Sequence, residues 1–572
     1  MELASGFRLA DREVWPQEGR IVGPSGSVHV EPKTMAVLLE LARHGGAVVS
    51  REQIHAVVWP RQVVTDDVLT RCVSQLRRAL GDRSGEPRFV QTIARRGYRL
   101  LARAVPLPGA TPSREPETLL VLPFAGYSAE IEPWLLDGLT ELLITRLASL
   151  PGLRVISRTT AMKFRGATDS IPAIAAQVGA TWVVEGSVLG SAERLQVVAQ
   201  LIDAQTDTHA WAGQYLRDVT DLLLLQNAIA EKIAGAVERT LGHPDEQADW
   251  NVRLPAAAMR DYLRGRYLVS RRSAVDLREA LTHLERVSNV APDYAPAWAS
   301  QAEIRMLLAH YGAEPSQTSV AATRALLQRA LTIDPHQPIA LACLGAVSFF
   351  FDREFDTARS YLRQALDRLP SYAVALLTLG NVHAASRQFE EAEEWVAQAL
   401  LVDPLDVGIL MNLGDHRILS GRYQAAVDAL EQAQQLVPGH RPSGLRLAWA
   451  AALAGRRDIA DATLNDMLPA EGKPDAAWWE YEALVAAALG EPSRAATAAD
   501  MLDRQAKAGF VGPWSRARAL AAAGRKDQAI AALSVCIDER SSSVPFMAVT
   551  PAFASLSAEP AFRELVRRAR LV

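Results

Sequence analysis

The stretch "TDDVLTRCVSQLRRALGD", Thr65 to Asp82, decides how the N-terminal part of this chain is interpreted. Its leucines and valine recur at steps of four, three and four residues, which predicts a helix with one apolar stripe. The stripe consists of Leu69, Val73, Leu76 and Leu80. The opposite face carries arginine and hydrogen-bonding side chains and no carboxylate, namely Thr70, Arg71, Ser74, Gln75 and Arg78. Such a face is either solvated or suited to lie against an anionic partner.

The charge of the chain is unevenly distributed. All 572 residues together carry a net charge of −4. Between Arg61 and Arg103, ten basic residues stand against four acidic ones, so this stretch is +6 and the rest must be −10. A basic module on an acidic body indicates that one end of the chain meets a polyanion.

Short elements are predicted on both sides of the helix. Before it, a Gly/Pro/Ser cluster at 23–27 predicts a hairpin, and Pro32 opens a first helix. Ser50 and Gln53 then have the spacing of a capping box, which predicts a second helix. After Thr65–Asp82, apolar residues alternate through 89–100 around a basic turn, which predicts a β-hairpin. The tip of that hairpin carries Arg95, Arg96 and Gly97.

The order of strands, three helices and a basic hairpin resembles the winged helix-turn-helix domain of OmpR/PhoB-type regulators, in the CadC/HilA-like branch. The residues that carry the resemblance are "VVSREQIHAVVWP", "VVTDDVLTRCVSQLRRAL" and "FVQTIARRGYRL". By this resemblance residues 1–104 form a DNA-binding domain of the α+β class, with its recognition helix at 65–80 and its wing at 92–98. Neither a phosphorylated receiver domain before it nor a membrane helix after it is expected.

The recognition helix is expected to lie in the major groove of double-stranded DNA, where its exposed face reaches the base edges. Arg71 suits guanine and Gln75 suits adenine. Thr70 and Ser74 can serve either a base or a phosphate. Contacts with the phosphate backbone are expected from the helix end and the wing, through Arg77, Arg78, Thr92, Arg95, Arg96 and Tyr98.

A proline-rich linker is predicted at 105–117, because "AVPLPGATPSREPE" holds four prolines. Strands and helices alternate from 118 to 245, which predicts a small α/β domain. The segments "DGLTELLITRL", "LRVISRT", "VVEGSV" and "VAQLIDAQT" resemble the TolB-like N-terminal domain, which bacteria fuse to adenylate cyclases or DNA-binding modules.

No residue pattern in the chain predicts a catalytic, metal or cofactor site. Asp137 and Glu141 share a helix face at i, i+4, and we interpret them as capping and solvating the first turns rather than as paired acids. Glu185 is assigned a structural role in a strand. Three distant cysteines suit neither a disulfide framework nor a zinc site. No window reaches the ~18 apolar residues that span a bilayer, so a cytoplasmic protein without membrane contact is expected.

A period of 34 to 35 residues runs through the last segment, 255–572. Its repeated positions are Pro335, Pro370, Pro404 and Pro438; Gly345, Gly380 and Gly414; and Ala358, Ala392 and Ala426. The small residues allow two helices to pack closely, and each proline ends a pair. This pattern is that of the tetratricopeptide repeat, an all-α solenoid whose concave surface binds a protein or peptide partner. A nine-residue echo near the C-terminus, at 551–565, is expected to cap it.

Together these parts predict a multidomain transcriptional regulator that binds double-stranded DNA, with signal input or partner binding through the TolB-like and repeat regions. Because one winged helix reads only a short site, dimeric or tandem copies are expected on DNA. The alternative is a repeat-protein scaffold whose winged helix makes nonspecific DNA or protein contacts. An enzyme is the third hypothesis, and no nucleophile, phosphate-loop or metal motif supports it.

Overall fold

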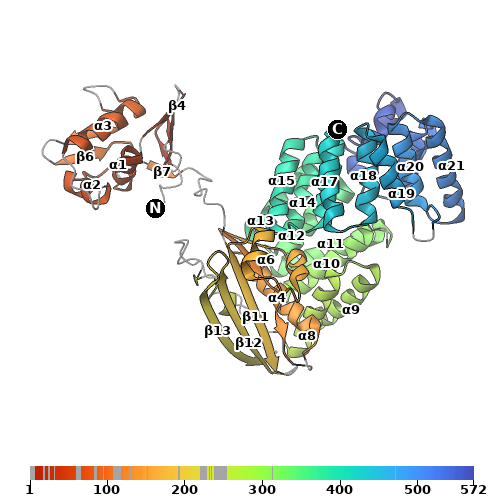
Figure 1. Cartoon of the computed structure of the whole chain (residues 1–572), viewed down its shortest axis with the longest axis horizontal. Helices are drawn as coiled ribbons and strands as arrows, with labels where there is room; N and C mark the ends of the chain where they lie inside the picture. Colours follow the sequence, from red (N-terminus) through yellow and green to blue (C-terminus); the bar gives the residue numbers. More distant parts are fainter. Residues whose placement is uncertain are drawn as a thin grey trace. The chain divides into compact units, whose positions relative to one another are not determined.

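The structure is a computed structural model of the whole chain (Figure 1). The residues that it describes are 7–16, 20–23, 26–30, 32–44, 46–58, 66–82, 87–93, 96–102, 104–106, 117–128, 131–150, 152–190, 194–218, 228–230, 232–233, 235–236, 254–311, 313–469 and 472–571. The chain divides into two compact units, Met1–Pro116 and Glu117–Val572.

The first unit combines an antiparallel sheet, three helices and a separate hairpin. The sheet has the order β4-β3-β2-β1-β7 and consists of β1 (Phe7–Leu9), β2 (Arg12–Trp15), β3 (Arg20–Gly23), β4 (Gly26–His29) and β7 (Ala104–Pro106). The helices are α1 (Pro32–Arg43), α2 (Arg51–Val58) and α3 (Asp66–Leu80), and the hairpin pairs β5 (Val90–Ile93) with β6 (Gly97–Leu100). The predicted helices, the capping box and the hairpin are confirmed. Ser50 N–H donates to Gln53 Oε1 at 2.9 Å, and Gln53 N–H donates to Ser50 Oγ at 3.2 Å.

Strand β7 was not predicted. Its residues fall at the end of the predicted domain and the start of the predicted linker, where prolines dominate the sequence. In the structure Ala104 pairs with Leu9 and Pro106 with Phe7, so β7 forms the edge of the sheet beside β1. Pro is tolerated there because an edge strand leaves one row of backbone groups unpaired.

The second unit begins with a mixed sheet of order β10-β8-β11-β12-β13, with β9 beside β11. Its strands are β8 (Glu117–Val121), β9 (Ala125–Gly126), β10 (Leu153–Val155), β11 (Trp182–Gly190), β12 (Arg194–Asp203) and β13 (Thr208–Asp218). Strands β10, β8 and β11 are parallel, and the long strands β11, β12 and β13 are antiparallel. The helices of this part are α4 (Pro133–Leu147), α5 (Arg158–Ala161), η1 (Met162–Phe164) and α6 (Ile171–Val178).

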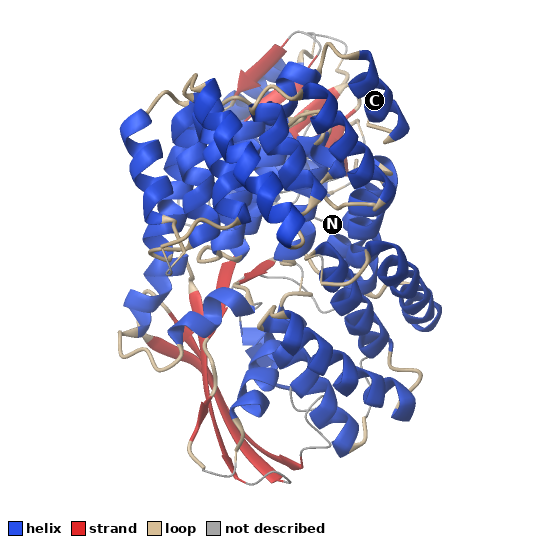
Figure 2. Cartoon of the chain, turned by 90° about the vertical axis from the view of Figure 1, so that its right-hand side faces the viewer, coloured by secondary structure: helices blue, strands red, loops and turns tan. Residues whose placement is uncertain are grey.

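The rest of the second unit is helical, and Figure 2 shows its helices stacked beside the long strands. Its antiparallel pairs are α8 (Ala256–Ser270) with α9 (Ala274–Val290), α10 (Ala295–His310) with α11 (Ser316–Ile333), α12 (Pro338–Val347) with α13 (Phe355–Arg368), α14 (Ala373–Ala385) with α15 (Phe389–Val402), α16 (Val407–Leu419) with α17 (Tyr423–Leu436), α18 (Arg441–Leu453) with α19 (Arg457–Asp466), α20 (Ala476–Ala488) with α21 (Pro492–Ala508), and α22 (Pro513–Ala522) with α23 (Lys526–Asp538). A π-helical turn, η3 (Ser348–Asp352), follows α12, and η4 (Val544–Phe546), η5 (Pro551–Leu556) and α24 (Pro560–Arg568) end the chain.

The repeated glycines lie where the two helices of a pair touch. A Cβ atom on Gly345 would meet Leu362 at 2.6 Å, and one on Gly414 would meet Leu430 at 2.6 Å. Gly265 stands in the same relation to Leu284 in α9, at 2.8 Å, so this packing is already present two pairs before Gly345, the first of the repeated glycines. The predicted close packing of small residues is therefore confirmed.

The predicted α/β domain and the solenoid are not separate bodies in the structure. One apolar core runs continuously from Leu119 to Leu369, through the sheet, α4 and the first helix pairs. Polar contacts reinforce the junction: Ser157 N–H donates to Val402 O at 2.8 Å, and Thr160 Oγ1 donates to the buried Asp403 carboxylate at 2.6 Å. The sequence could not reveal this, because these partners lie more than two hundred residues apart in the chain.

Candidate nucleic-acid interface

Helix α3 buries one face completely and exposes the other. The apolar stripe, Leu69, Val73, Leu76 and Leu80, is at most 1% exposed and packs into the core of the first unit. Thr70, Arg71, Ser74 and Arg78 are exposed on the outer face. Cys72 lies at the edge of the stripe and is buried. The predicted orientation of the helix is therefore the observed one.

Two of the predicted reading residues also make contacts inside the domain. Ser74 Oγ donates to Thr70 O at 2.9 Å, one turn earlier on the same helix. Gln75 is half-buried, and its Oε1 accepts a hydrogen bond from Thr34 Oγ1 of α1 at 2.8 Å. Because Thr34 is fully buried, this bond orients the Gln75 amide from below the surface.

Arg77 points into the domain, whereas its neighbour Arg78 is exposed. Arg77 Nε and Nη2 both donate to Val90 O, at 3.1 and 3.0 Å. Arg77 Nη2 also donates to Thr92 Oγ1 at 2.8 Å. The sequence predicted a phosphate contact for Arg77, but in the structure its guanidinium ties α3 to the first strand of the hairpin.

The end of α3 provides a second tie that sequence reasoning missed. Gly81 takes the left-handed conformation, with φ +83°, and ends the helix. The next carboxylate, Asp82, accepts hydrogen bonds from the backbone N–H groups of Arg88, Phe89 and Val90, each at 2.8 Å. A Gly-Asp pair directly after a predicted helix was the available signal. Asp82 thus holds the start of β5 against the end of α3.

The hairpin presents part of the predicted wing surface. Thr92 and Arg96 are exposed, while Arg95 lies outside the described residues. Tyr98 was predicted to contact the DNA backbone and does not lie on this surface. Tyr98 is 3% exposed, and the Arg51 guanidinium lies over its ring at 5.5 Å from the ring centroid.

Gly97 explains why Tyr98 turns inward. Tyr98 N–H donates to Val49 O at 3.0 Å, and Val49 N–H donates to Tyr98 O at 2.8 Å. This bridge brings the two backbones so close that a Cβ on Gly97 would lie 2.0 Å from Val49 O. Gly97 also has φ +136°, a conformation that side-chain-bearing residues rarely adopt.

The two acidic residues of α4, Asp137 and Glu141, have a structural role, but they form buried ion pairs instead of capping the helix. Asp137 and Glu141 were predicted to cap and solvate the helix, but both side chains are largely buried and paired with arginines. Arg158 and Arg165 contact Asp137, and Arg266 of α8 lies 2.8 Å from Glu141. Burial alone would raise the pKa of Glu141, but Arg266 and Arg158 hold it below its usual value. These ion pairs therefore join the sheet region to the solenoid.

Among the described residues no cluster of His, Cys, Asp or Glu is arranged to hold a metal ion. In that same part of the chain, no helix is both long and apolar enough to cross a bilayer. Glu185 is exposed on β11, so its side chain faces solvent rather than a site.

Comparison with known proteins assigns two segments of the chain to families. Residues 25–100 match the family "Transcriptional regulatory protein, C terminal", and residues 352–409 match a tetratricopeptide repeat family. The chain carries an OmpR/PhoB-type domain and tetratricopeptide repeats. The first match contains α3 and the hairpin, and the second contains the pair α14 and α15.

Two relatives cover larger parts of the chain. "Putative adenylate cyclase 3" of Rhizobium meliloti is 31% identical over 39% of this chain and 38% of its own length. "Transcriptional regulator HilA" of Salmonella typhimurium is 23% identical over 58% of this chain and 59% of its own length. The chain thus spans between 38% and 59% of the length of these relatives. The solved DNA-binding domain of Escherichia coli CadC is 29% identical and covers 18% of this chain and 96% of that domain, with a TM-score of 0.17.

Proposed function

We propose that the chain is a DNA-binding transcriptional regulator whose helix α3 enters the major groove. The observation that carries the proposal is the two-faced packing of α3. Its apolar stripe is fully buried, and its exposed face carries Arg71 and Arg78 with two hydroxyl side chains and no carboxylate. The relatives whose names describe transcriptional regulators or activators support it.

In this proposal Arg71 and Gln75 read bases. An exposed arginine near the middle of α3 can make a bidentate contact with guanine. Thr34 Oγ1 donates to Gln75 Oε1 at 2.8 Å and so orients the amide that would meet adenine. Thr70 and Ser74 lie beside them and contact a base or a phosphate.

The phosphate contacts come from Arg78, Thr92, Arg95 and Arg96. Arg78 and Arg96 are exposed and no carboxylate pairs with either of them within the described residues. We assign Arg77 a structural role within the domain, because its guanidinium donates hydrogen bonds to Val90 O and Thr92 Oγ1.

The rest of the chain receives the signal or a partner. We include in the proposal that residues 118–245 are TolB-like and that the concave surface of the solenoid binds a protein or peptide. We also propose a cytoplasmic location, dimeric or tandem binding on DNA, and no enzymatic activity. The Rhizobium relative named as a cyclase makes the last point testable: purified full-length chain should form no cyclic AMP from ATP.

The test of DNA binding is footprinting and a competition assay with the full-length chain on genomic promoter fragments. A regulator should prefer its site over bulk DNA by about a thousandfold or more. Arg71→Ala should relax the preference at one base position, while Arg8→Ala, an exposed arginine on β1, should leave it unchanged. Equal binding of all fragments would favour the scaffold alternative. Protection of one isolated half-site at full occupancy would refute the proposed dimeric or tandem binding.

A further inference from the structure

The solenoid curves so that its C-terminal cap, residues 544–571, contacts the third and fourth helix pairs, α12–α13 and α14–α15. Phe546 of η4 meets Phe349 of η3 edge to face, with ring centroids 5.7 Å apart. Arg387, between α14 and α15, donates through Nη2 to Ala548 O at 2.7 Å. The cap therefore contacts repeats that precede it by about 160 residues.

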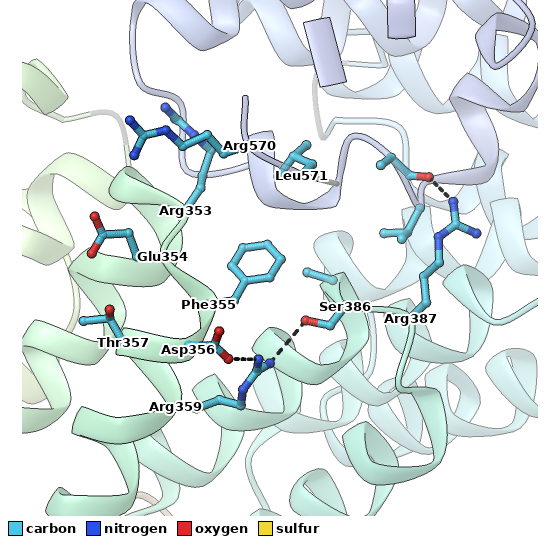
Figure 3. Close-up of a pocket in the computed structure, with 13 residues that line it drawn as sticks. Arg353, Glu354, Phe355, Asp356, Thr357, Arg359, Ser386, Arg387, Arg570 and Leu571 are labelled. Atoms are coloured by element: carbon cyan, nitrogen blue, oxygen red, sulfur yellow. Dashed lines mark hydrogen bonds and ion pairs between the residues drawn. The ribbon is translucent and has the colours of Figure 1, made fainter. Parts of the chain in front are cut away.

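A cavity of about 540 Å³ lies at this junction (Figure 3). Its walls come from the start of α13, the end of α14 and the cap, and they include Arg353, Phe355, Arg359, Arg387, Val549 and Arg570. In Figure 3 Phe355 lies between Arg353 and Arg570 on one side and Arg387 on the other. The cavity is thus bounded by arginines around one aromatic ring.

The residue type at two of these arginines departs from the pattern of the later repeats. The turn between the two helices of a pair requires one residue in the left-handed conformation, and it is glycine at positions 421, 455, 490 and 524. Thirty-four and sixty-eight residues before Gly421, the same position is occupied by Arg387 and Arg353, each with φ +62°. Arg570 of the cap also has positive φ. Glycine adopts this conformation without strain and arginine does not.

Arginine at this position has a side-chain partner elsewhere in the solenoid. Arg272, in the first pair, has φ +54° and donates through Nη1 to the Tyr311 hydroxyl at 3.3 Å. At the cavity, by contrast, Nε and Nη1 of Arg353 are buried and have no hydrogen-bond partner. Buried polar atoms without a partner are costly and call for a ligand or a solvent molecule.

The positive charge of the cavity is only partly neutralised. Asp356 pairs with Arg359, which also donates to Ser386 Oγ at 3.4 Å. Glu354 lines the cavity but is exposed, and within the described residues no carboxylate pairs with Arg353, Arg387 or Arg570. Burial lowers the pKa of Arg353, and Arg540 and Arg570 lower it further while Asp352 opposes them. An anion in the cavity would relieve this repulsion.

We propose that this cavity binds a small phosphorylated molecule, with its phosphate held by Arg353 and Arg570 and the remainder lying over Phe355 toward Arg387. Guanidinium groups match the geometry of phosphate oxygens and form charge-assisted hydrogen bonds with them. The cavity volume exceeds that of a bare phosphate and lies within the range of small-molecule sites. The ligand would tie the cap to the repeats. The proposal is independent of DNA binding, since none of these residues belongs to the first unit.

Isothermal titration calorimetry on the full-length chain tests it, with inorganic phosphate, phenyl phosphate and succinate as probes at equal ionic strength. Both phosphates should bind, and phenyl phosphate should bind more tightly because its ring can pack on Phe355. Arg353→Gly and Arg387→Gly restore the glycine found at the four later turns, so each variant should fold, and Arg353→Gly should lower the affinity by about tenfold or more. Arg272→Gly is the matched control, since it changes the same backbone position and charge outside the cavity.

If neither inorganic phosphate nor phenyl phosphate gave a binding heat, the proposal would be overturned. So would equal affinities of the chain and of the Arg353→Gly, Arg387→Gly double variant, because phosphate would then bind elsewhere. Succinate binding as tightly as the phosphates would overturn the assignment of a phosphorylated ligand. Relaxed base preference in the Arg71→Ala variant with phosphate binding intact would separate this site from the proposed function.

Discussion

Arg77 and Arg78 are neighbours on α3, yet the structure predicts opposite consequences when each is replaced by alanine. Arg77→Ala removes three hydrogen bonds, two to Val90 O and one to Thr92 Oγ1. Arg78→Ala removes an exposed charge and no hydrogen bond that helps to hold the hairpin. The pair therefore distinguishes a residue that shapes the domain from one that contacts phosphate.

The expected magnitude follows from the bonds at Arg77. A hydrogen bond from a charged donor contributes about 1.5–3 kcal/mol when buried, and Arg77 is only half-buried, so solvent screens it. We expect Arg77→Ala to lower the free energy of opening the hairpin by about 1–2 kcal/mol. That loss corresponds to amide exchange about 5- to 30-fold faster across β5.

Two measurements on the full-length chain separate the roles. Hydrogen exchange should accelerate at Val90–Ile93 in Arg77→Ala and stay unchanged in Arg78→Ala. The dependence of DNA affinity on salt should become shallower by about 0.9 in logarithmic slope for Arg78→Ala, as for one lost phosphate contact, and keep its slope for Arg77→Ala. If Arg77→Ala reduced the slope and left exchange unchanged, our assignment of Arg77 would be wrong.

Three further predictions concern single positions. Gly97→Ala places a methyl group 2.0 Å from Val49 O and should destabilise the hairpin by about 2–4 kcal/mol; normal DNA affinity and normal exchange at β6 would contradict it. Gly414→Ala meets Leu430 at 2.6 Å and should lower the free energy of unfolding of the second unit by about 1–3 kcal/mol in urea titrations, whereas Gly509→Ala, which faces open space, should not; equal effects would refute the packing argument. Burial lowers the pKa of His416 to about 4 from 6.5, so the unfolded chain takes up the proton first as the pH falls from 6.5 to 4, and stability should drop by up to about 3 kcal/mol over that window. His416→Gln should flatten this dependence in urea titrations at pH 7 and pH 5, and an unchanged dependence would show that other groups cause it.

Much of the fold is predictable because it rests on local periodicity. The spacing of Leu69, Val73, Leu76 and Leu80 places one face of α3 in the core whatever the partner helices are. The recurrence of Gly345, Gly380 and Gly414 marks the sites where two helices of a pair touch. The side-chain oxygens of Ser50 and Gln53 each accept a hydrogen bond from the other residue's backbone N–H within one turn. The first and third features depend on residues a few positions apart, and the second depends on a period of 34 to 35 residues.

The candidate interface was only partly predictable, because neighbouring residues on a helix differ in what packs beside them. Arg77 and Arg78 are equivalent in sequence terms, and the position of β5 decides that only Arg77 finds Val90 O. The sequence predicts Tyr98 at the end of an exposed wing, but the bridge to Val49 turns its side chain inward. Asp82 acts on three backbone groups that become neighbours only when the chain turns back after α3.

By itself the sequence determined the helices, the hairpin, the 34-residue period and the basic character of the N-terminal part. Those properties follow from side-chain periodicity and from charge, which folding does not change. The tertiary structure alone decided that Glu141 meets Arg266, that the sheet and the solenoid share one core, and that the cap brings Arg570 to Arg353. These contacts join residues more than a hundred positions apart, and their existence depends on the curvature that accumulates as the helix pairs stack.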